Sequence, residues 1–333
     1  MSAETMPPPN ITDPPPAEIA KELGELRQAL DQELPPKVLD RNLLIATWNI
    51  RAFGDLTKKW KSEPNDSPKR DFHALLEITE IVSRFHVVAL QEVRANLRAL
   101  RYMLKVLGPY WSFLLTDVTR GSSGNYERMA LLFDTRVLNL SGLACELVVP
   151  PEQLAKGAIN PDALDRQFAR TPYAVSFKAL DTTFILVTMH AIYGKGTDER
   201  RRELKAIAGW LSEWAMDINA YGHNLMALGD FNIDRKGDPL YMAFTSTGLT
   251  TPPELDNVPR TIFDVGPNPE HFYDQIAWFN KESGKPALTL RYLDAGSFDF
   301  TKVALKSLNL SKVELSWRIS DHYPLWAEFS LRD

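Results

Sequence analysis

The stretch Met226–Asn232 constrains the fold of this chain more than any other. It combines a short apolar run with a glycine, followed by a carboxylate and a carboxamide two residues apart. An apolar run that ends at a turn signal is typical of a buried strand. Because side chains alternate along an extended chain, we expect Asp230 and Asn232 to point to the same side of the backbone. The stretch therefore predicts a buried strand whose end carries polar chemistry.

The same pattern recurs along the chain, where other apolar, strand-like runs are followed or bordered by polar side chains. These side chains are Asn49, Glu92, His190, Asp274, Asp321 and His322. In a layered α/β fold such strand ends would gather at one edge of the core. Oxygen ligands of this kind suit Mg²⁺ or Mn²⁺ better than Zn²⁺, and a cation there would stabilise the charge on a phosphoryl oxygen attacked by water. A histidine held by a carboxylate can activate that water or protonate the leaving oxygen.

The other four histidines are interpreted as structural. His73 and His86 lie within or at the end of a helical pattern, and His223 lies in a turn. His271 lies three residues before Asp274, but we rank it below His190 and His322 because it does not end an apolar run.

Composition narrows the class of protein. The 333 residues are 44% apolar and 24% charged, which is typical of a globular chain with a sizeable core. The net charge of −5 argues against binding to nucleic acid by bulk charge and leaves room for a local basic patch. Cys145 is the single cysteine, so no intramolecular disulfide is possible. We find neither a membrane-spanning run nor a signal-peptide pattern, and we expect a cytoplasmic location.

The chain is predicted to have two parts, residues 1–40 and 41–333. The first begins with a proline-rich tail over residues 1–16 and continues as a short amphipathic helix over 17–34. That helix either packs on its own chain or docks to a protein partner or a second copy. In residues 41–333, strand and helix patterns alternate and then pair, which predicts an α/β fold of two packed sheets with helices outside.

A second amphipathic helix is predicted directly after Glu92. Val93, Leu97, Leu100, Leu104 and Leu107 form its apolar stripe, and Arg94, Arg98, Arg101 and Lys105 form a basic stripe. A charged helix face is usually just solvated. Arg94 lies only two residues after Glu92, so its side chain could face the ligand or substrate that Glu92 binds.

The polar motifs together resemble the endonuclease/exonuclease/phosphatase superfamily, and within it they are most similar to deoxyribonuclease I. The motifs are Thr47–Arg51, Gln91–Arg94, Tyr126–Arg128, Met189-His190, Gly229–Asn232, Tyr273-Asp274 and Ser320–Pro324. The resemblance implies a four-layer sandwich of two mostly antiparallel β-sheets flanked by helices. It also implies divalent-metal-dependent hydrolysis of phosphodiesters or phosphomonoesters.

The resemblance also implies roles for individual residues. Glu92, with Asn49 and Asp321, would bind the metal. His190 would be oriented by Glu127 and His322 by Asp274, while Asp230 and Asn232 would position the nucleophile and stabilise the pentacovalent phosphorus. The resemblance does not decide which histidine is the general base and which is the general acid.

Substrate residues follow from the same resemblance. Arg94 would reach into the minor groove of DNA, Tyr126 would pack on a deoxyribose, Arg170 would contact a phosphate, and Arg51 is a further substrate-binding candidate. The disulfides and calcium sites of the secreted nucleases cannot be reproduced in full with one cysteine. The amino-terminal extension and the excursion over residues 147–166 are also unmatched.

Three functions compete. The first is a metal-dependent endonuclease that cleaves double-stranded DNA with little sequence specificity. The second is a phosphatase or phosphodiesterase for a small or lipid-linked substrate, because this catalytic core serves several substrate classes. The third, a binding protein on a retired nuclease scaffold, is disfavoured because all the motif residues are present.

Overall fold

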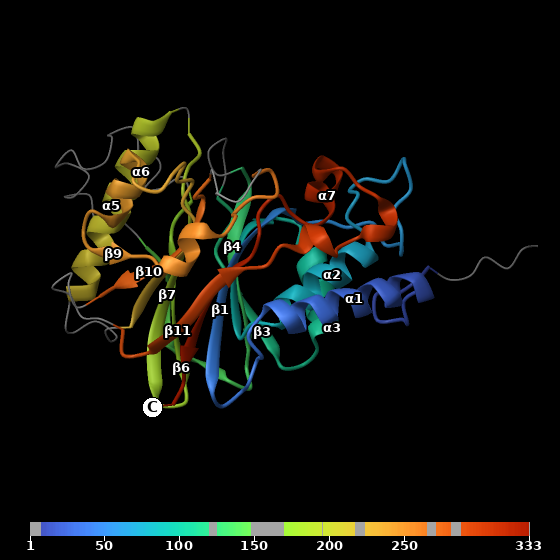
Figure 1. The fold of residues 1–333 in the computed structure, drawn as a ribbon, viewed down its shortest axis with the longest axis horizontal. Helices are drawn as coiled ribbons and strands as arrows, with labels where there is room; N and C mark the ends of the chain where they lie inside the picture. The colour runs from blue at the N-terminus through green and yellow to red at the C-terminus, as the bar shows by residue number, and fades with distance from the viewer. Residues whose placement is uncertain are drawn as a thin grey trace, which may run out of the picture.

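Two six-stranded sheets pack face to face in the computed structural model, with helices on both outer faces (Figure 1). The structure describes residues 8–119, 125–147, 170–194, 196–216, 224–264, 271–280 and 288–332. The first sheet contains, in spatial order, β11 (Arg291–Ser297), β12 (Leu325–Ser330), β1 (Asn42–Phe53), β2 (Val87–Arg94), β4 (Glu127–Asp134) and β3 (Trp111–Leu115). The second contains β5 (Leu138–Glu146), β6 (Tyr173–Ala179), β7 (Thr182–His190), β8 (Leu225–Asp230), β10 (Asp274–Phe279) and β9 (Leu249–Thr250).

Strand pairing within each sheet is mostly antiparallel, as the sequence predicted. The pairs β1–β2 and β7–β8 are parallel, and the other neighbours run antiparallel. The parallel pairs occupy the middle of each sheet, and α2 (Phe72–Ser83) and α5 (Thr197–Met216) connect their strands. A parallel pair requires such a crossover connection.

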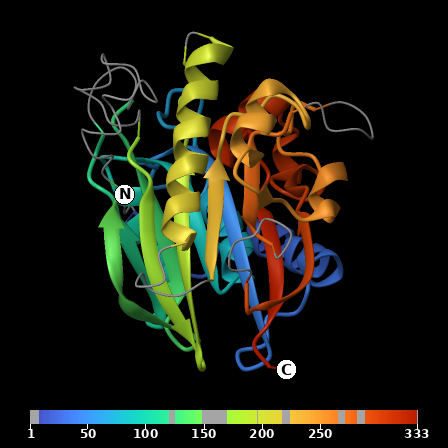
Figure 2. The same cartoon turned by 90° about the vertical axis from the view of Figure 1, so that its left-hand side faces the viewer.

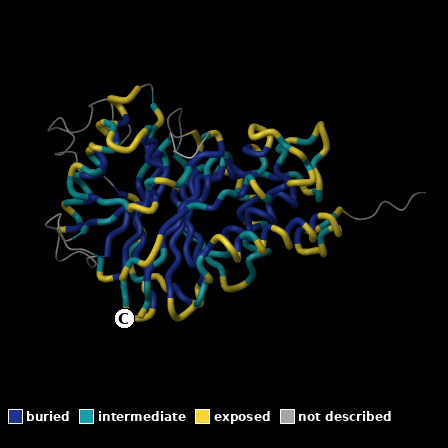
Figure 3. Tube along the Cα trace, viewed as in Figure 1, coloured by how far each residue is buried: buried dark blue, intermediate teal, exposed yellow. Residues whose placement is uncertain are grey.

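Three hydrophobic clusters separate the four layers. One cluster joins the facing sides of the two sheets and includes Ile45 of β1 and Phe177 of β6. Another joins the first sheet to α1 (Ala17–Glu33), α2, α3 (Arg98–Leu107) and α7 (Lys312–Arg318). The last joins the second sheet to α5 and α6 (Pro239–Thr245), and Figure 2 shows α5 along the outer face of that sheet. The buried trace follows the strands of both sheets (Figure 3).

The amino-terminal helix α1 packs on its own chain. Its apolar residues Ile19, Leu23, Leu26 and Leu30 are buried in the cluster that also contains β1 and α2. The face that a protein partner or a second copy would use is thus occupied. The predicted division of the chain at residue 40 stays a prediction.

Several predicted boundaries differ from the structure. The helix predicted directly after Glu92 is wrong at its start, because Val93 and Arg94 belong to β2 and α3 begins at Arg98. The apolar pattern also predicts a helix over 198–219, which is described as α5 up to Met216. Residues 121–124, in the loop that the sequence predicts over 121–128, and residues 148–166 of the predicted excursion lie outside the described residues.

Five of the strands and α-helices were not predicted: β5, β9, β11, α6 and α7. No helix among the described residues is both long and apolar enough to cross a membrane.

Candidate active site

The strand directions bring the predicted polar residues to one edge of the sandwich. Strands β1, β2, β7 and β8 run toward this edge, whereas β4, β10 and β12 run antiparallel to them and leave it. Residues near strand ends are therefore Asn49, Glu92, His190 and Asp230, and residues at or just before strand starts are Glu127, Asp274, Asp321 and His322. Within the second sheet, Asp230 is the direct register partner of both His190 and Asp274.

One hydrogen bond links two of these polar residues across the two sheets. Nδ2 of Asn49 donates to Oδ2 of Asp230 at 2.9 Å, and both side chains are buried. The structure thus joins residues 181 positions apart in the sequence. Asn49, from the first sheet, and Asp230, from the second, lie in one site.

His322 and Asp274 form the tightest pair of the site. Nδ1 of His322 lies 2.6 Å from Oδ2 of Asp274, whose side chain is fully buried. Burial lowers the pKa of His322, but the adjacent Asp274 carboxylate outweighs burial and raises the pKa above its ordinary value. The predicted pairing of these two residues is present in the structure.

His190 lies between two carboxylates without hydrogen-bonding to either. Its Nδ1 is 3.6 Å from Oε2 of Glu127, and its Nε2 is 3.7 Å from Oδ2 of Asp230. Burial, together with nearby Arg170, lowers the pKa of His190 well below its ordinary value. The surroundings therefore favour the neutral imidazole at His190 and the charged imidazolium at His322.

Glu127 is held by two arginines and an asparagine. Arg170 donates to Oε2 through Nε at 2.8 Å and lies 2.7 Å from it through Nη2, while Asn125 donates to Oε1 at 2.6 Å. Nη2 of Arg94 lies 3.2 Å from Oε1. Both arginines predicted to contact DNA thus engage the carboxylate beside His190, and their contact with substrate stays a prediction.

The other two substrate candidates lie at the rim. Tyr126 precedes Glu127 and is 60% exposed. Arg51 donates to Oγ of Ser316 at 2.7 Å, stacks 3.8 Å from the ring of Trp317, and lies 3.5 Å from Oδ2 of Asp321. Helix α7, which the sequence did not reveal, therefore fixes the position of Arg51.

The Gly-Asp-Phe-Asn motif owes its glycine to close backbone contact. Gly229 has φ +143°, and a Cβ atom there would lie 2.0 Å from the carbonyl oxygen of Met189. Beyond it, Asn232 adopts φ 50°, and its backbone N–H donates to Oδ1 of Asp230 at 2.9 Å. Its Nδ2 donates to the Ala191 carbonyl at 2.8 Å. Asp230 and Asn232 thus share one hydrogen-bonded turn.

Oxygen atoms suitable for a divalent cation are present at the predicted metal residues. Oδ1 of Asn49 is buried without a hydrogen-bond partner among the described residues. Glu92 adopts φ 58°, and its Oε2 accepts a hydrogen bond from the Ala52 N–H at 2.9 Å. Asp230, Asp274 and His322 also each offer a ligand atom within 4.8 Å of one another. An unsatisfied buried oxygen beside carboxylates fits a hard cation.

Arg70 is a supporting residue that sequence reasoning missed. The polar stretch Gly54–Arg70, rich in Lys, Pro and Asp, predicts a surface loop, yet the side chain of Arg70 is buried. Its guanidinium donates to the carbonyls of Arg51, Ala52, Arg318 and Ile319. It thereby ties the segment that carries Asn49 to the segment that carries Asp321.

The fold and this site define a phosphoester hydrolase that depends on a divalent metal. The chain belongs to the Endonuclease/Exonuclease/phosphatase family, whose model matches residues 46–322. No curated protein matches the chain.

Solved structures share the fold at low sequence identity. An endonuclease/exonuclease/phosphatase family protein from Bacteroides thetaiotaomicron is 17% identical with a TM-score of 0.55, covering 87% of this chain and 95% of that chain. A mannosyl-6-phosphatase of the same organism is 17% identical, with a TM-score of 0.53 and coverage of 86% and 99%. D. rerio TDP2, complexed with a single strand DNA product, is 12% identical, with a TM-score of 0.52 and coverage of 86% and 98%.

Proposed function

We propose that this chain is a DNA endonuclease with little sequence specificity that hydrolyses phosphodiester bonds with Mg²⁺ or Mn²⁺. Glu92, Asn49 and Asp321 would hold the metal, which supplies charge stabilisation at the phosphoryl oxygen. His190, oriented by Glu127, and His322, oriented by Asp274, would transfer protons. Asp230 and Asn232 would position the attacking water.

The observation that carries the choice of DNA is a set of exposed aromatic side chains on the segments that hold the catalytic residues. Tyr126 adjoins Glu127, and Tyr193, 64% exposed, follows His190 by three residues. Two more lie beside the segment of Asp321 and His322. Phe263 follows Thr261, which pairs with His322, and Trp317 stacks on Arg51.

Exposed aromatic rings can stack on the bases and sugars of a nucleic acid. Base–aromatic stacking contributes about 1–3 kcal/mol per base and tolerates any sequence. Four such rings around one site suit a polymer whose sugars and bases lie on both sides of the scissile phosphate. A small phosphate ester would contact fewer of them.

The preference for a duplex rests on Arg94. Its side chain is 29% exposed although it pairs with Glu127, so part of the guanidinium remains open to solvent beside the catalytic carboxylate. A planar guanidinium suits both phosphates and base edges in a groove. Single-stranded DNA, as bound by the TDP2 neighbour, is the matched comparison substrate.

The test compares DNA with a small chromogenic phosphodiester under saturating Mg²⁺. We expect chelator-sensitive nicking of supercoiled plasmid, and we expect Tyr126→Ala and Arg94→Ala to weaken DNA cleavage at least about 10-fold more than cleavage of the small ester. Tyr110→Ala is the control, because Tyr110 is exposed but precedes β3 at the opposite edge of the sheet.

The small-substrate phosphatase is the alternative. It would be favoured if plasmid stayed intact while small phosphate esters were hydrolysed. Equal losses on both substrates for Tyr126→Ala would remove the stacking argument. A steep loss of DNA cleavage with rising salt would support binding to the phosphate backbone.

A further inference from the structure

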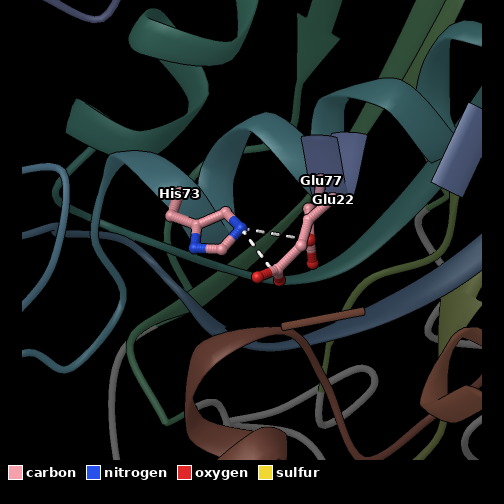
Figure 4. Close-up of side chains that lie close together, drawn as sticks. All are labelled: Glu22, His73 and Glu77. Carbon is pink, nitrogen blue, oxygen red and sulfur yellow. Dashed lines mark ion pairs between the residues drawn. The ribbon is translucent and has the colours of Figure 1, made fainter. Parts of the chain in front are cut away.

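Three buried side chains with metal-ligating atoms meet between α1 and α2, outside the candidate active site. Glu22 comes from α1, and His73 and Glu77 come from α2. His73 and Glu77 are fully buried, and Glu22 is 5% exposed. Figure 4 shows Nε2 of the histidine facing both carboxylates.

The two distances from the histidine nitrogen match the ligand spacing of a tetrahedral metal site. Nε2 of His73 lies 3.2 Å from Oε1 of Glu77 and 3.5 Å from Oε2 of Glu22. One ligand atom from each of the three residues lies within 4.8 Å of the others. Zinc bonds to nitrogen and oxygen of about 2.0–2.2 Å place neighbouring tetrahedral ligands about 3.3–3.6 Å apart.

Two of the atoms that face the centre of this cluster lack hydrogen bonds. Oε2 of Glu22 and Nε2 of His73 are buried and have no hydrogen-bond partner among the described residues. In contrast, both oxygens of Glu77 accept from the Leu305 N–H, and Oε1 of Glu22 accepts from the Ser307 N–H. Buried polar atoms are normally satisfied, so two unsatisfied atoms directed at one point indicate a missing ligand.

Charge also favours a cation at this point. With both carboxylates ionised and the imidazole neutral, the buried cluster would carry a charge of −2, and burial, which raises the pKa of Glu77, opposes this charge in the absence of a cation. The charged groups that act most strongly on His73 are Glu77, Glu22 and Asp71, all of them acids. Uncompensated buried charge is strongly unfavourable, and a divalent cation would neutralise the cluster.

We propose that Glu22, His73 and Glu77 bind one Zn²⁺ ion, leaving its fourth position for water. The imidazole nitrogen favours zinc over Mg²⁺, in contrast with the oxygen-rich active site. The ion would fasten α1, which precedes the family match over residues 46–322, to α2. The sequence contained one signal for this site, because His73 and Glu77 are four residues apart on one helix face.

Zinc content of the full chain tests the proposal. The wild type, Glu22→Gln and Glu25→Gln are dialysed against Zn²⁺ in saturating Mg²⁺, and bound zinc is measured by elemental analysis. Glu25 is the control, since it lies on the same helix but is exposed and pairs with Lys21. Zinc at the active site is common to all three proteins. We expect Glu22→Gln to bind one equivalent less than the other two.

A second measurement separates metal loss from misfolding. Added Zn²⁺ should raise the Tm of the wild type and Glu25→Gln but not of Glu22→Gln or His73→Gln, while Mg²⁺-supported hydrolysis and circular dichroism show that the variants are folded. Co²⁺ in place of zinc should give four-coordinate absorption bands that His73→Gln abolishes. Equal zinc content in the wild type and Glu22→Gln, or a Tm that follows pH but not Zn²⁺, would overturn the proposal.

Discussion

Removing Arg170 tests how the site holds His190. Oε2 of Glu127, the oxygen nearest Nδ1 of His190, is bound by both nitrogens of Arg170, whereas Oε1 is shared by Asn125 and Arg94. Burial raises the pKa of Glu127, and the two arginines oppose this rise. Arg170→Ala therefore removes the contacts of the oxygen that faces the histidine.

The size of the effect follows from burial and contact number. Loss of one partner from a buried ion pair typically costs about 3–5 kcal/mol. Because Arg94 and Asn125 still hold Glu127, we expect Arg170→Ala to lower the free energy of unfolding by about 3 kcal/mol. Arg94 makes one contact with Glu127, at 3.2 Å, donates to the Asn125 carbonyl at 2.6 Å and is 29% exposed, so Arg94→Ala should cost about 1 kcal/mol or less.

Urea unfolding and steady-state kinetics check both consequences. With the small phosphodiester as substrate, Arg170→Ala should lower kcat about as much as Glu127→Gln. The reason is that both changes would weaken the contact that holds the His190 imidazole in place. Arg170→Lys keeps the charge without the paired contacts and should fall between. If Arg170→Ala were no less stable than Arg94→Ala, or kept wild-type kcat, Glu127 would not depend on Arg170.

Three further predictions follow from the same site and core. Glu92→Gln should lose hydrolysis at low Mg²⁺ and regain part of it in excess Mg²⁺ or Mn²⁺, and unchanged metal dependence would exclude Glu92 as a ligand. His190→Ala and His322→Ala should each lower kcat at least ~10²-fold, with a combined effect smaller than the product. Burial lowers the pKa of His86 from 6.5 to about 3, so the unfolded chain takes up this proton first as pH falls, and His86 alone should lower the free energy of unfolding by about 2 kcal/mol from pH 7 to pH 5. His86→Gln should flatten that dependence in urea titrations, and an unchanged slope would contradict it.

The positions of the candidate site residues could be predicted because each one ends or borders a buried strand. Buried strands leave a strong local signal of continuous apolar residues, and the polar residue that interrupts the run stands out. Asp230 and Asp274 illustrate this, since both lie at ends of strands whose other residues are almost all buried. The local pattern indicates where a strand ends, and topology then brings the ends together.

Edge strands and short helices gave weaker signals. β5 and β11 each pair on one side only and are largely exposed, so neither carries a continuous apolar run. Helix α7 does carry a usable signal, because Ser311 and Glu314 form a capping box at its start. Its seven residues are too few for a convincing helical period.

The error at Arg94 has a specific backbone cause. The register of β2 shifts between Leu90 and Val93, and Glu92 within this irregularity adopts φ 58°. The spacing of apolar residues across the irregularity imitates a helix. Arg70 was missed for another reason, because two of the carbonyls that hold it lie 248 and 249 residues away.

The placement of Arg94 and Arg170 separates two tasks at Glu127. Arg170 is 10% exposed and binds the oxygen that faces His190, so we expect it to affect the orientation of the histidine. Arg94 is 29% exposed and binds the other oxygen, which Asn125 also holds. A DNA phosphate that drew Arg94 away would leave both contacts from Arg170 intact. We therefore expect that Arg94, but not Arg170, could bind substrate without disturbing His190.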